Sequence, residues 1–156
     1  MRTTEITLII LIITLTFLLG WLSNEAWQQL TPKEIPTAPG DHIPEENLQQ
    51  TNQTITIKIN QPFYYTKYSP TKSMLSLLDS GHNGIMIQPN NTTQIKVGDI
   101  ISYKLNENTT IVHRVKQIRT DEKGIYYIVK GDNNPQADPY RIRPENIQGI
   151  LVALIY

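Results

Sequence analysis

The sequence predicts a mainly β protein, with one antiparallel β domain (barrel-like or sandwich-like) behind an N-terminal transmembrane helix. Residues 6–22, ITLIILIITLTFLLGWL, carry no charge and form the densest apolar run of the chain. From residue 54 onward the apolar residues alternate in short runs that are separated by turn-forming residues. No helical period of useful length lies between these runs, which is typical of an all-β domain.

The apolar run has the length expected at the lower limit for crossing a bilayer core. Arg2 precedes it, Glu25 follows it, and Trp21 and Trp27 lie where interfacial aromatic residues anchor a helix end. We therefore expect residues 1–5 in the cytoplasm, a retained single-pass anchor over 6–22, and the rest outside the cytoplasm. A cleaved signal peptide is the alternative, but LSNEAWQQ at 22–29 offers no convincing small-x-small cleavage site. Asn-x-Ser/Thr motifs fit this orientation weakly, since chance supplies several in an Asn-rich and Thr-rich chain; they begin at Asn52, Asn90, Asn91 and Asn108.

A polar segment over 23–53 follows the apolar run. It contains four prolines, Pro32, Pro36, Pro39 and Pro44, and has no steady period. We interpret it as a linker or stalk that holds the next domain near the membrane, with a possible short helix around 45–50.

The β domain is expected over 54–156. TITIKIN at 54–60 places Ile55, Ile57 and Ile59 on one face, as in a half-buried strand. Further strands are predicted at 62–68, 84–88, 99–105, 110–118, 124–130 and 147–156, with turns at 80–81, 89–91, 106–108 and 131–135. The stretch 73–78 reads as a short helix or a turn.

Composition excludes several classes of function. The formal net charge is zero, which argues against a nucleic-acid partner. The chain has no cysteine, and its histidines, His42, His82 and His113, lack the spacing of metal ligands. Nucleotide-binding glycine motifs and the GxSxG motif of α/β-hydrolases are absent from the sequence. We expect no metal and no cofactor.

His113 lies in TIVHRVKQI, where period two places it on the inward face with Ile111 and Val115, opposite Arg114 and Lys116. A core histidine bonded to a backbone group is the simpler interpretation. If the strands at 110–118 and 124–130 form a hairpin, however, opposed residue numbers sum to about 244 and His113 lies opposite Gly131. Asp132 then lies beside it, and a turn at 133–135 can return Asp138 to the same place. A histidine with a carboxylate partner can act as a general base.

A general base needs a nucleophile. The serines after the linker are Ser69, Ser73, Ser76, Ser80 and Ser102. Ser73 stands out among them, because Pro70 interrupts the sheet before it and an apolar stretch follows, and such a junction can hold a side chain at a surface groove. The pattern alone does not select it, since any of these serines could be a turn residue.

Three sequence blocks together resemble signal peptidase I of the archaeal and endoplasmic-reticulum type. Ser73-Met74 resembles the nucleophile motif Ser-Met-x-Pro, and the other blocks are VGDIISY at 97–103 with IVHRV at 111–115, and KGDNN at 130–134 with Asp138 and GILV at 149–152. The resemblance implies a serine peptidase with a signal-peptidase-like antiparallel β domain, in which Ser73 is the nucleophile, His113 the general base, Asp138 the main supporting carboxylate and Asp132 a second one. It also implies that the backbone N–H of Ser73 contributes to the oxyanion hole. The chain departs from the motif at Ser76, where the family has proline, and at Lys72, where it often has a small residue.

The resulting expectation is a membrane-anchored serine endopeptidase that removes signal peptides from exported preproteins, with the bilayer and the signal peptides as its partners. An inactive, membrane-tethered β domain that binds exported segments is the alternative, and the residues at 72 and 76 favour it. A structural surface protein is a third interpretation, and it predicts no cleft beside Ser73.

Overall fold

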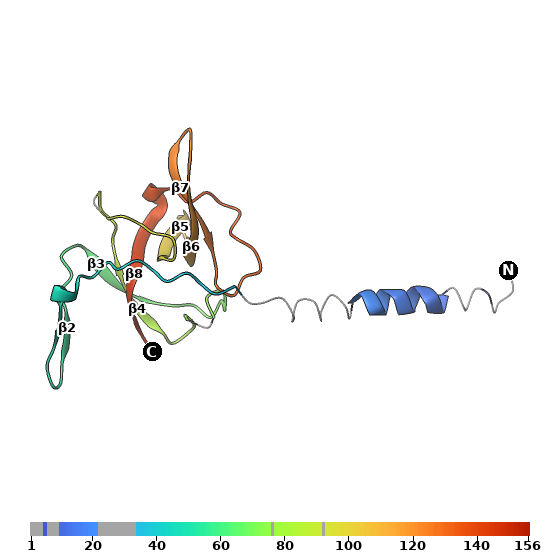
Figure 1. Ribbon diagram of the computed structural model, residues 1–156, viewed down its shortest axis with the longest axis horizontal. Coiled ribbons are helices and arrows are strands. Elements are labelled where there is room, and N and C mark those ends of the chain that lie inside the picture. Colours follow the sequence, from blue (N-terminus) through green and yellow to red (C-terminus); the bar gives the residue numbers. More distant parts are fainter. Residues whose placement is uncertain (1–4, 6–9, 22–33, 76, 92) are drawn as a thin grey trace. The chain divides into compact units, whose positions relative to one another are not determined.

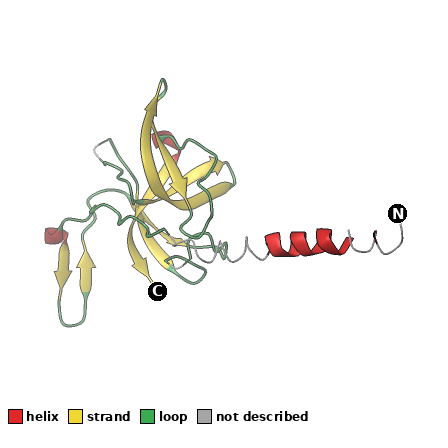
Figure 2. Ribbon diagram, turned by 45° about the vertical axis from the view of Figure 1, so that its right-hand side comes forward, coloured by secondary structure: helices red, strands yellow, loops and turns green. Residues whose placement is uncertain are grey.

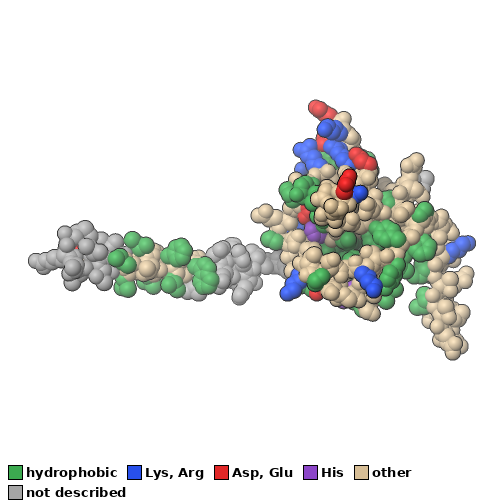
Figure 3. Space-filling view, turned by 180° about the vertical axis from the view of Figure 1, so that it is seen from behind, with side chains coloured by type: hydrophobic (Ala, Val, Ile, Leu, Met, Phe, Trp, Pro, Cys, Tyr) green, Lys and Arg blue, Asp and Glu red, His purple; other side chains and the backbone are tan. Residues whose placement is uncertain are grey.

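The computed structural model describes residues 5, 10–21, 34–75, 77–91 and 93–156. The chain divides into two compact units, Met1–Ile35 and Pro36–Tyr156. In the first unit, residues 10–21 are helical and their large apolar side chains are exposed, as the green side chains of Figure 3 show. No helix within the described residues is both long enough and apolar enough to cross a membrane. The predicted span 6–22 includes residues 6–9 and 22, and the predicted cytoplasmic segment includes residues 1–4; these lie outside the described residues, as does Trp27.

The second unit is built on a six-stranded antiparallel sheet with the order β3-β4-β8-β5-β6-β7 (Figure 1). Its strands are β3 (Phe63–Lys67), β4 (Asn83–Ile87), β5 (Ile100–Asn106), β6 (Thr109–Asp121), β7 (Gly124–Lys130) and β8 (Ile147–Ile155). A separate hairpin pairs β1 (Leu48–Gln50) with β2 (Ile55–Ile57). Two short 3-10 turns, η1 (Glu45–Asn47) and η2 (Pro144–Asn146), precede β1 and β8. The mainly β, antiparallel fold class is therefore confirmed, and every run predicted as a strand overlaps an observed one.

The β6–β7 hairpin carries the register that the sequence predicts. Arg114 pairs with Lys130 and Val115 with Val129, so opposed residue numbers sum to 244. A bulge between Val115 and Gln117 then shifts the register by one residue toward the turn. His113 is therefore one position beyond the last pair, level with the start of the loop after β7.

The sheet is strongly coiled, so that β3 approaches β5 although two strands lie between them. The Tyr64 hydroxyl on β3 lies 2.6 Å from Ser102 Oγ on β5. This contact crosses β8 at Gly149, where a Cβ atom would lie only 2.5 Å from the Tyr64 hydroxyl oxygen. The coil therefore depends on a residue without a side chain at this position.

Alternation along β5 and β6 supplies apolar residues to both faces of the sheet. The larger core cluster includes Ile101, Tyr103, Val115 and Ile150. The smaller one, on the opposite face, joins Ile100 to Met74 and Leu78 of the segment between β3 and β4. Both faces are buried here because the segment around Ser73 covers the second one.

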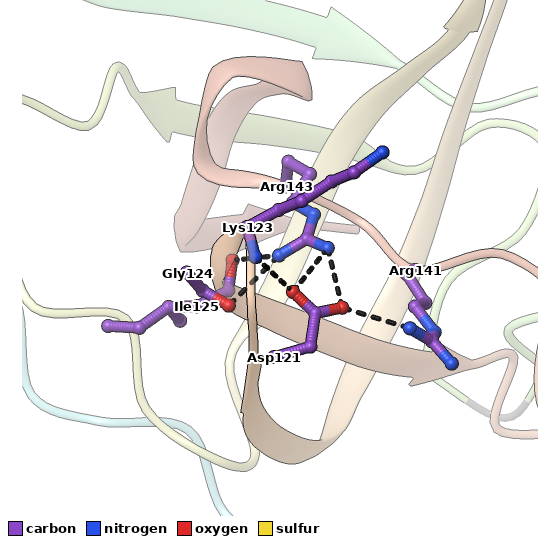
Figure 4. A network of polar contacts seen from close by, with 6 residues as sticks. All are labelled: Asp121, Lys123, Gly124, Ile125, Arg141 and Arg143. Atoms are coloured by element: carbon purple, nitrogen blue, oxygen red, sulfur yellow. Dashed lines mark hydrogen bonds and ion pairs between the residues drawn. The ribbon is translucent and has the colours of Figure 1, made fainter.

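A charged network fixes the tip of the β6–β7 hairpin. Asp121 accepts hydrogen bonds from the guanidinium groups of Arg141 and Arg143 and from the Lys123 N–H (Figure 4). The bond to Arg143 is the main cause that lowers the pKa of Asp121. Both arginines also stack on Tyr126, with 5.1 and 5.2 Å from the guanidinium carbon to the ring centre. The chain that follows Asp138 is thereby tied to the hairpin.

The segment before β3 differs from the sequence expectation. The linker is predicted over 23–53, whereas residues 36–53 belong to the same compact unit as the sheet. Within it, 45–47 form the 3-10 turn η1, and 48–50 form a strand instead of continuing a helix. The β1–β2 hairpin projects from the sheet (Figure 2), which leaves Ile55 72% exposed. The expectation that Ile55 is half-buried is wrong because, among the described strands, β2 pairs with β1 alone.

Candidate active site

His113 and Asp138 form a close pair. The Nδ1 atom of His113 lies 2.6 Å from Oδ2 of Asp138. His113 is 6% exposed and sits on β6, while Asp138 lies in the loop after β7, where its backbone N–H donates to the Val129 carbonyl at 2.9 Å. An ionised carboxylate only accepts, so Nδ1 carries the proton and Nε2 is the basic nitrogen of the neutral ring. The structure thus brings together two of the residues proposed for catalysis.

A third residue completes this arrangement. The Tyr103 hydroxyl donates to the same oxygen, Oδ2 of Asp138, at 2.5 Å. Tyr103 is fully buried on β5, where it pairs with Ile111 and lies on the same face as His113, its diagonal neighbour on β6. Both donors therefore reach one carboxylate oxygen from adjacent strands.

Asp132 has a different partner from the one expected. Its two oxygens accept from Nε and Nη2 of Arg114, each at 2.8 Å, in a bidentate pair. The remaining Arg114 nitrogen donates to the carbonyl oxygens of Thr37 and Gly98 at 3.1 and 2.8 Å. Arg114 points away from His113, as the alternation predicts, but it is only 4% exposed. Asp132 is therefore part of a buried ion pair and makes no hydrogen bond to His113 in the described chain.

Ser73 lies on a turn that the loop after β7 holds in place. The backbone N–H of Asn133 donates to the Ser73 carbonyl at 2.9 Å, and its side-chain amide donates to the Lys72 carbonyl at 3.1 Å. A Cβ atom at Gly131 would lie 2.6 Å from the Ser73 carbonyl oxygen, so only glycine permits this approach. Lys72 has a φ of 60°, a left-handed conformation that is uncommon for a residue with a side chain. The loop contacts over-determine this strained position directly before the candidate nucleophile.

A cavity of about 450 Å³ connects Ser73 to His113. Its walls are residues 66–69 at the end of β3, 71, 73, 74 and 78 in the following segment, 109–113 of β6, and 134. The interpretation as a structural surface protein predicts no cleft beside Ser73, and this cavity argues against it. A peptide in the cavity would have the serine and the imidazole within its walls.

Ser73 Oγ and His113 are not hydrogen-bonded in the described chain. The Ser73 hydroxyl instead lies 3.2 Å from Thr71 Oγ1. Catalytic hydrogen bonds are often long or absent without substrate and tighten when it binds. Ser76, at the position where the family motif has proline, lies outside the described residues.

A second histidine–carboxylate pair lies away from the cavity. Nε2 of His42 is 2.9 Å from Oδ2 of Asp99, which also accepts from the Lys96 N–H at 2.7 Å, and Oδ1 accepts from the Gly40 N–H at 2.7 Å. Burial would raise the pKa of Asp99, but these hydrogen bonds outweigh it and lower that pKa below its ordinary value. Gly98 allows Ala38 to approach, because a Cβ there would lie 1.9 Å from the Ala38 carbonyl oxygen. The pair fastens residues 38–42 to the loop before β5.

The sequence did not single out Tyr103, Asn133 or the His42–Asp99 pair. A signal for Tyr103 existed, since a tyrosine on the inward face of a strand beside His113 needs a hydrogen-bond partner for its hydroxyl. The other contacts depend on loop paths that no local pattern encodes. Among the described residues, no group of three or more His, Cys, Asp or Glu side chains is placed to hold a metal ion.

Comparison with known proteins gives a partial similarity. Signal peptidase I W from Bacillus subtilis (strain 168) is 31% identical to this chain over 55 residues. The matched stretch covers 35% of this chain and 29% of that protein. No family model and no solved structure matches the chain. The similarity is to signal peptidase I at most, and it does not distinguish between the branches of that family.

Proposed function

We propose that this chain is a serine endopeptidase of the signal peptidase type, with Ser73 as nucleophile, His113 as general base and Asp138 as the carboxylate that orients the base. The observation that carries the proposal is that His113, which lies 2.6 Å from Asp138, lines the same cavity as Ser73. The partial similarity to a signal peptidase I supports the same reaction class.

The chemistry follows from these positions. Serine is a weak nucleophile until a neighbouring base accepts its proton. Nε2 of His113 takes the Ser73 proton as Oγ attacks the scissile carbonyl, and Asp138 stabilises the imidazolium that forms. The backbone N–H of Ser73 donates to the oxyanion. The imidazolium then protonates the leaving amine, and a water molecule, deprotonated by the same imidazole, hydrolyses the acyl-enzyme.

We also propose the branch of the signal peptidase family to which the chain is similar and the side of the membrane on which it acts. The substrate is the signal peptide of an exported preprotein, the histidine replaces the lysine of the bacterial branch, and residues 6–22 anchor the domain outside the cytoplasm. The anchor is supported by the uncharged apolar run and by exposed apolar side chains over 10–21. Anchoring raises the local concentration of a membrane-bound substrate without further contacts. Resistance of the full chain to alkaline extraction from membranes tests this part; complete extraction contradicts it.

Cleavage of a preprotein in detergent tests the peptidase directly. Ser73→Ala should abolish cleavage and leave the thermal midpoint of unfolding unchanged, because Ser73 is a partly exposed turn residue. Ser80→Ala is the matched control, since Ser80 is exposed and does not line the cavity. Wild-type cleavage by Ser73→Ala would contradict the assignment.

A second candidate is an inactive domain of the same kind that binds exported segments. The left-handed Lys72 and the hydrogen bond between the Ser73 and Thr71 hydroxyls, in place of one between Ser73 and His113, favour it. A fluorophosphonate probe separates the two candidates, because it reacts only with an activated serine. Labelling that is lost in both Ser73→Ala and His113→Ala supports the enzyme, whereas no labelling of the folded wild type supports the binding domain.

A further inference from the structure

Tyr103 is placed to act on the histidine through the carboxylate. Tyr103 does not itself line the cavity, and its hydroxyl shares Oδ2 of Asp138 with Nδ1 of His113. Since Tyr103 is fully buried and Asp138 largely so, water does not compete for these bonds. We propose that Tyr103 is a positioning residue that fixes the Asp138 carboxylate and sets the basicity of His113. This inference rests on the proposed peptidase mechanism.

The direction of the hydrogen bond is settled by its chemistry. Burial raises the pKa of the Tyr103 hydroxyl well above its ordinary value, and the hydrogen bond to Asp138 raises it further. The hydroxyl therefore keeps its proton throughout the range in which a peptidase works. A neutral phenol beside an ionised carboxylate donates, so Tyr103 withdraws negative charge from the oxygen that holds His113.

The sign of the effect on His113 follows. Negative charge on Oδ2 stabilises the imidazolium, and a second donor on that oxygen weakens the stabilisation. Without the Tyr103 hydroxyl, His113 should retain its proton to higher pH. Asp138 should also lose one of the two side-chain contacts that orient it, which lowers the rate of proton transfer.

The other ionisable groups described around the His113–Asp138 pair lie in the loop after β7, on the cavity wall and on the opposite face of β6. Tyr140 follows Asp138 in the loop and adds to the raised pKa of Tyr103. Lys67 and Tyr68 line the cavity from the end of β3. On the opposite face of β6, Arg114 and Asp132 neutralise each other in their bidentate pair. None of these groups shares Oδ2 of Asp138 with His113, whereas Tyr103 does. A change in the His113 titration on removal of the Tyr103 hydroxyl can therefore be assigned to this hydrogen bond.

Tyr103→Phe in the full chain tests the inference by kinetics. It should lower kcat by about tenfold, the rate equivalent of one hydrogen bond, and leave KM unchanged. The acid limb of its pH–rate profile should move to higher pH by roughly half a unit. Tyr127→Phe is the control, because it removes the hydroxyl of another buried core tyrosine and should change neither quantity. An unmoved acid limb, or the same shift in Tyr127→Phe, overturns the inference.

Two NMR measurements need no catalytic activity and so separate this inference from the proposed function. In Tyr103→Phe, the His113 ring should titrate at higher pH than in the wild type, while the His42 ring stays unchanged. In the wild type, the hydroxyl proton of Tyr103 should show a nuclear Overhauser effect to the Nδ1 proton of His113, since one oxygen accepts both. Loss of cleavage with both results intact would refute only the peptidase. Identical His113 titration, or a missing Overhauser effect, refutes the role of Tyr103.

Discussion

The two histidine–aspartate pairs of this domain are alike in composition and burial but differ in what surrounds them. The His42 and His113 side chains are each 8% exposed, and each lies within 3 Å of a carboxylate oxygen. Asp99 receives two backbone N–H groups besides His42, so its pair ties loops together. Asp138 receives the Tyr103 hydroxyl, and its histidine faces a cavity that holds a serine. A buried His–Asp pair alone therefore does not point to a catalytic base. The cavity and the serine beside His113 are what make it the candidate.

The largest expected contrast is between the two histidines. His113→Gln should reduce cleavage by about 10²–10⁴-fold, because general-base catalysis contributes in this range. His42→Gln should leave kcat/KM of the folded protein unchanged and lower stability by about 1–3 kcal/mol, since Asp99 loses a buried partner. Preprotein cleavage and thermal unfolding of both variants measure this. Equal losses of cleavage in the two variants would remove the distinction between the pairs.

The two aspartates of the loop after β7 should differ in the same way. Asp132→Asn breaks a buried bidentate pair with Arg114, so the free energy of unfolding should fall by about 3–5 kcal/mol. Asp138→Asn should instead mainly reduce kcat, because it presents the wrong partner to the His113 ring. Urea unfolding and cleavage kinetics distinguish these outcomes. An Asp132→Asn protein of wild-type stability with impaired kcat would return Asp132 to the catalytic group.

A smaller effect is expected where the loop after β7 contacts the turn that carries Ser73. Gly131→Ala places a Cβ atom 2.6 Å from the Ser73 carbonyl oxygen, and relieving this contact should cost about 1–3 kcal/mol. Because the displaced residue is Ser73, kcat should fall as well. Gly20→Ala is the control, since its Cβ would meet no atom within 4 Å. Unchanged stability and kcat in Gly131→Ala would mean that the loop does not hold Ser73.

The smallest effect concerns acid stability at the non-catalytic pair. The lowered pKa of Asp99 means that its ionised form stabilises the fold above the ordinary value of 3.8 and that this contribution is lost as pH falls through the lower, folded-state pKa. The wild type should therefore lose stability as the pH falls below about 3.8, and Asp99→Asn should lose less over the same range. Thermal midpoints measured between pH 5 and 2 give both slopes. If the thermal midpoints of the wild type and Asp99→Asn fall equally with pH, Asp99 is not responsible for the loss of stability in acid.

The sequence predicted what short-range patterns encode. Period two located the strands, and the short turn between β6 and β7 predicted, to within a one-residue bulge, the register that sets His113 level with the following loop. The hairpin register did not decide between Asp132 and Asp138 as the partner of His113, and only the family resemblance ranked Asp138 first. Both lie in one loop, and the choice depends on the pairing of Asp132 with Arg114. Arg114 is buried by Thr37 and Gly98, which are far from it in sequence. The hydrogen bond of Tyr103 to Asp138 and the left-handed turn at Lys72 also depend on long-range packing, so local sequence patterns did not predict them.

A double-mutant cycle on cleavage tests most directly whether Ser73 and His113 act in one proton-transfer chain. Residues that act as a unit are strongly non-additive, so Ser73→Ala, His113→Ala and the double variant should all have the same residual rate. The proton-transfer chain would be contradicted if the two single losses multiplied in the folded double variant, or if Ser73→Ala cleaved at the wild-type rate.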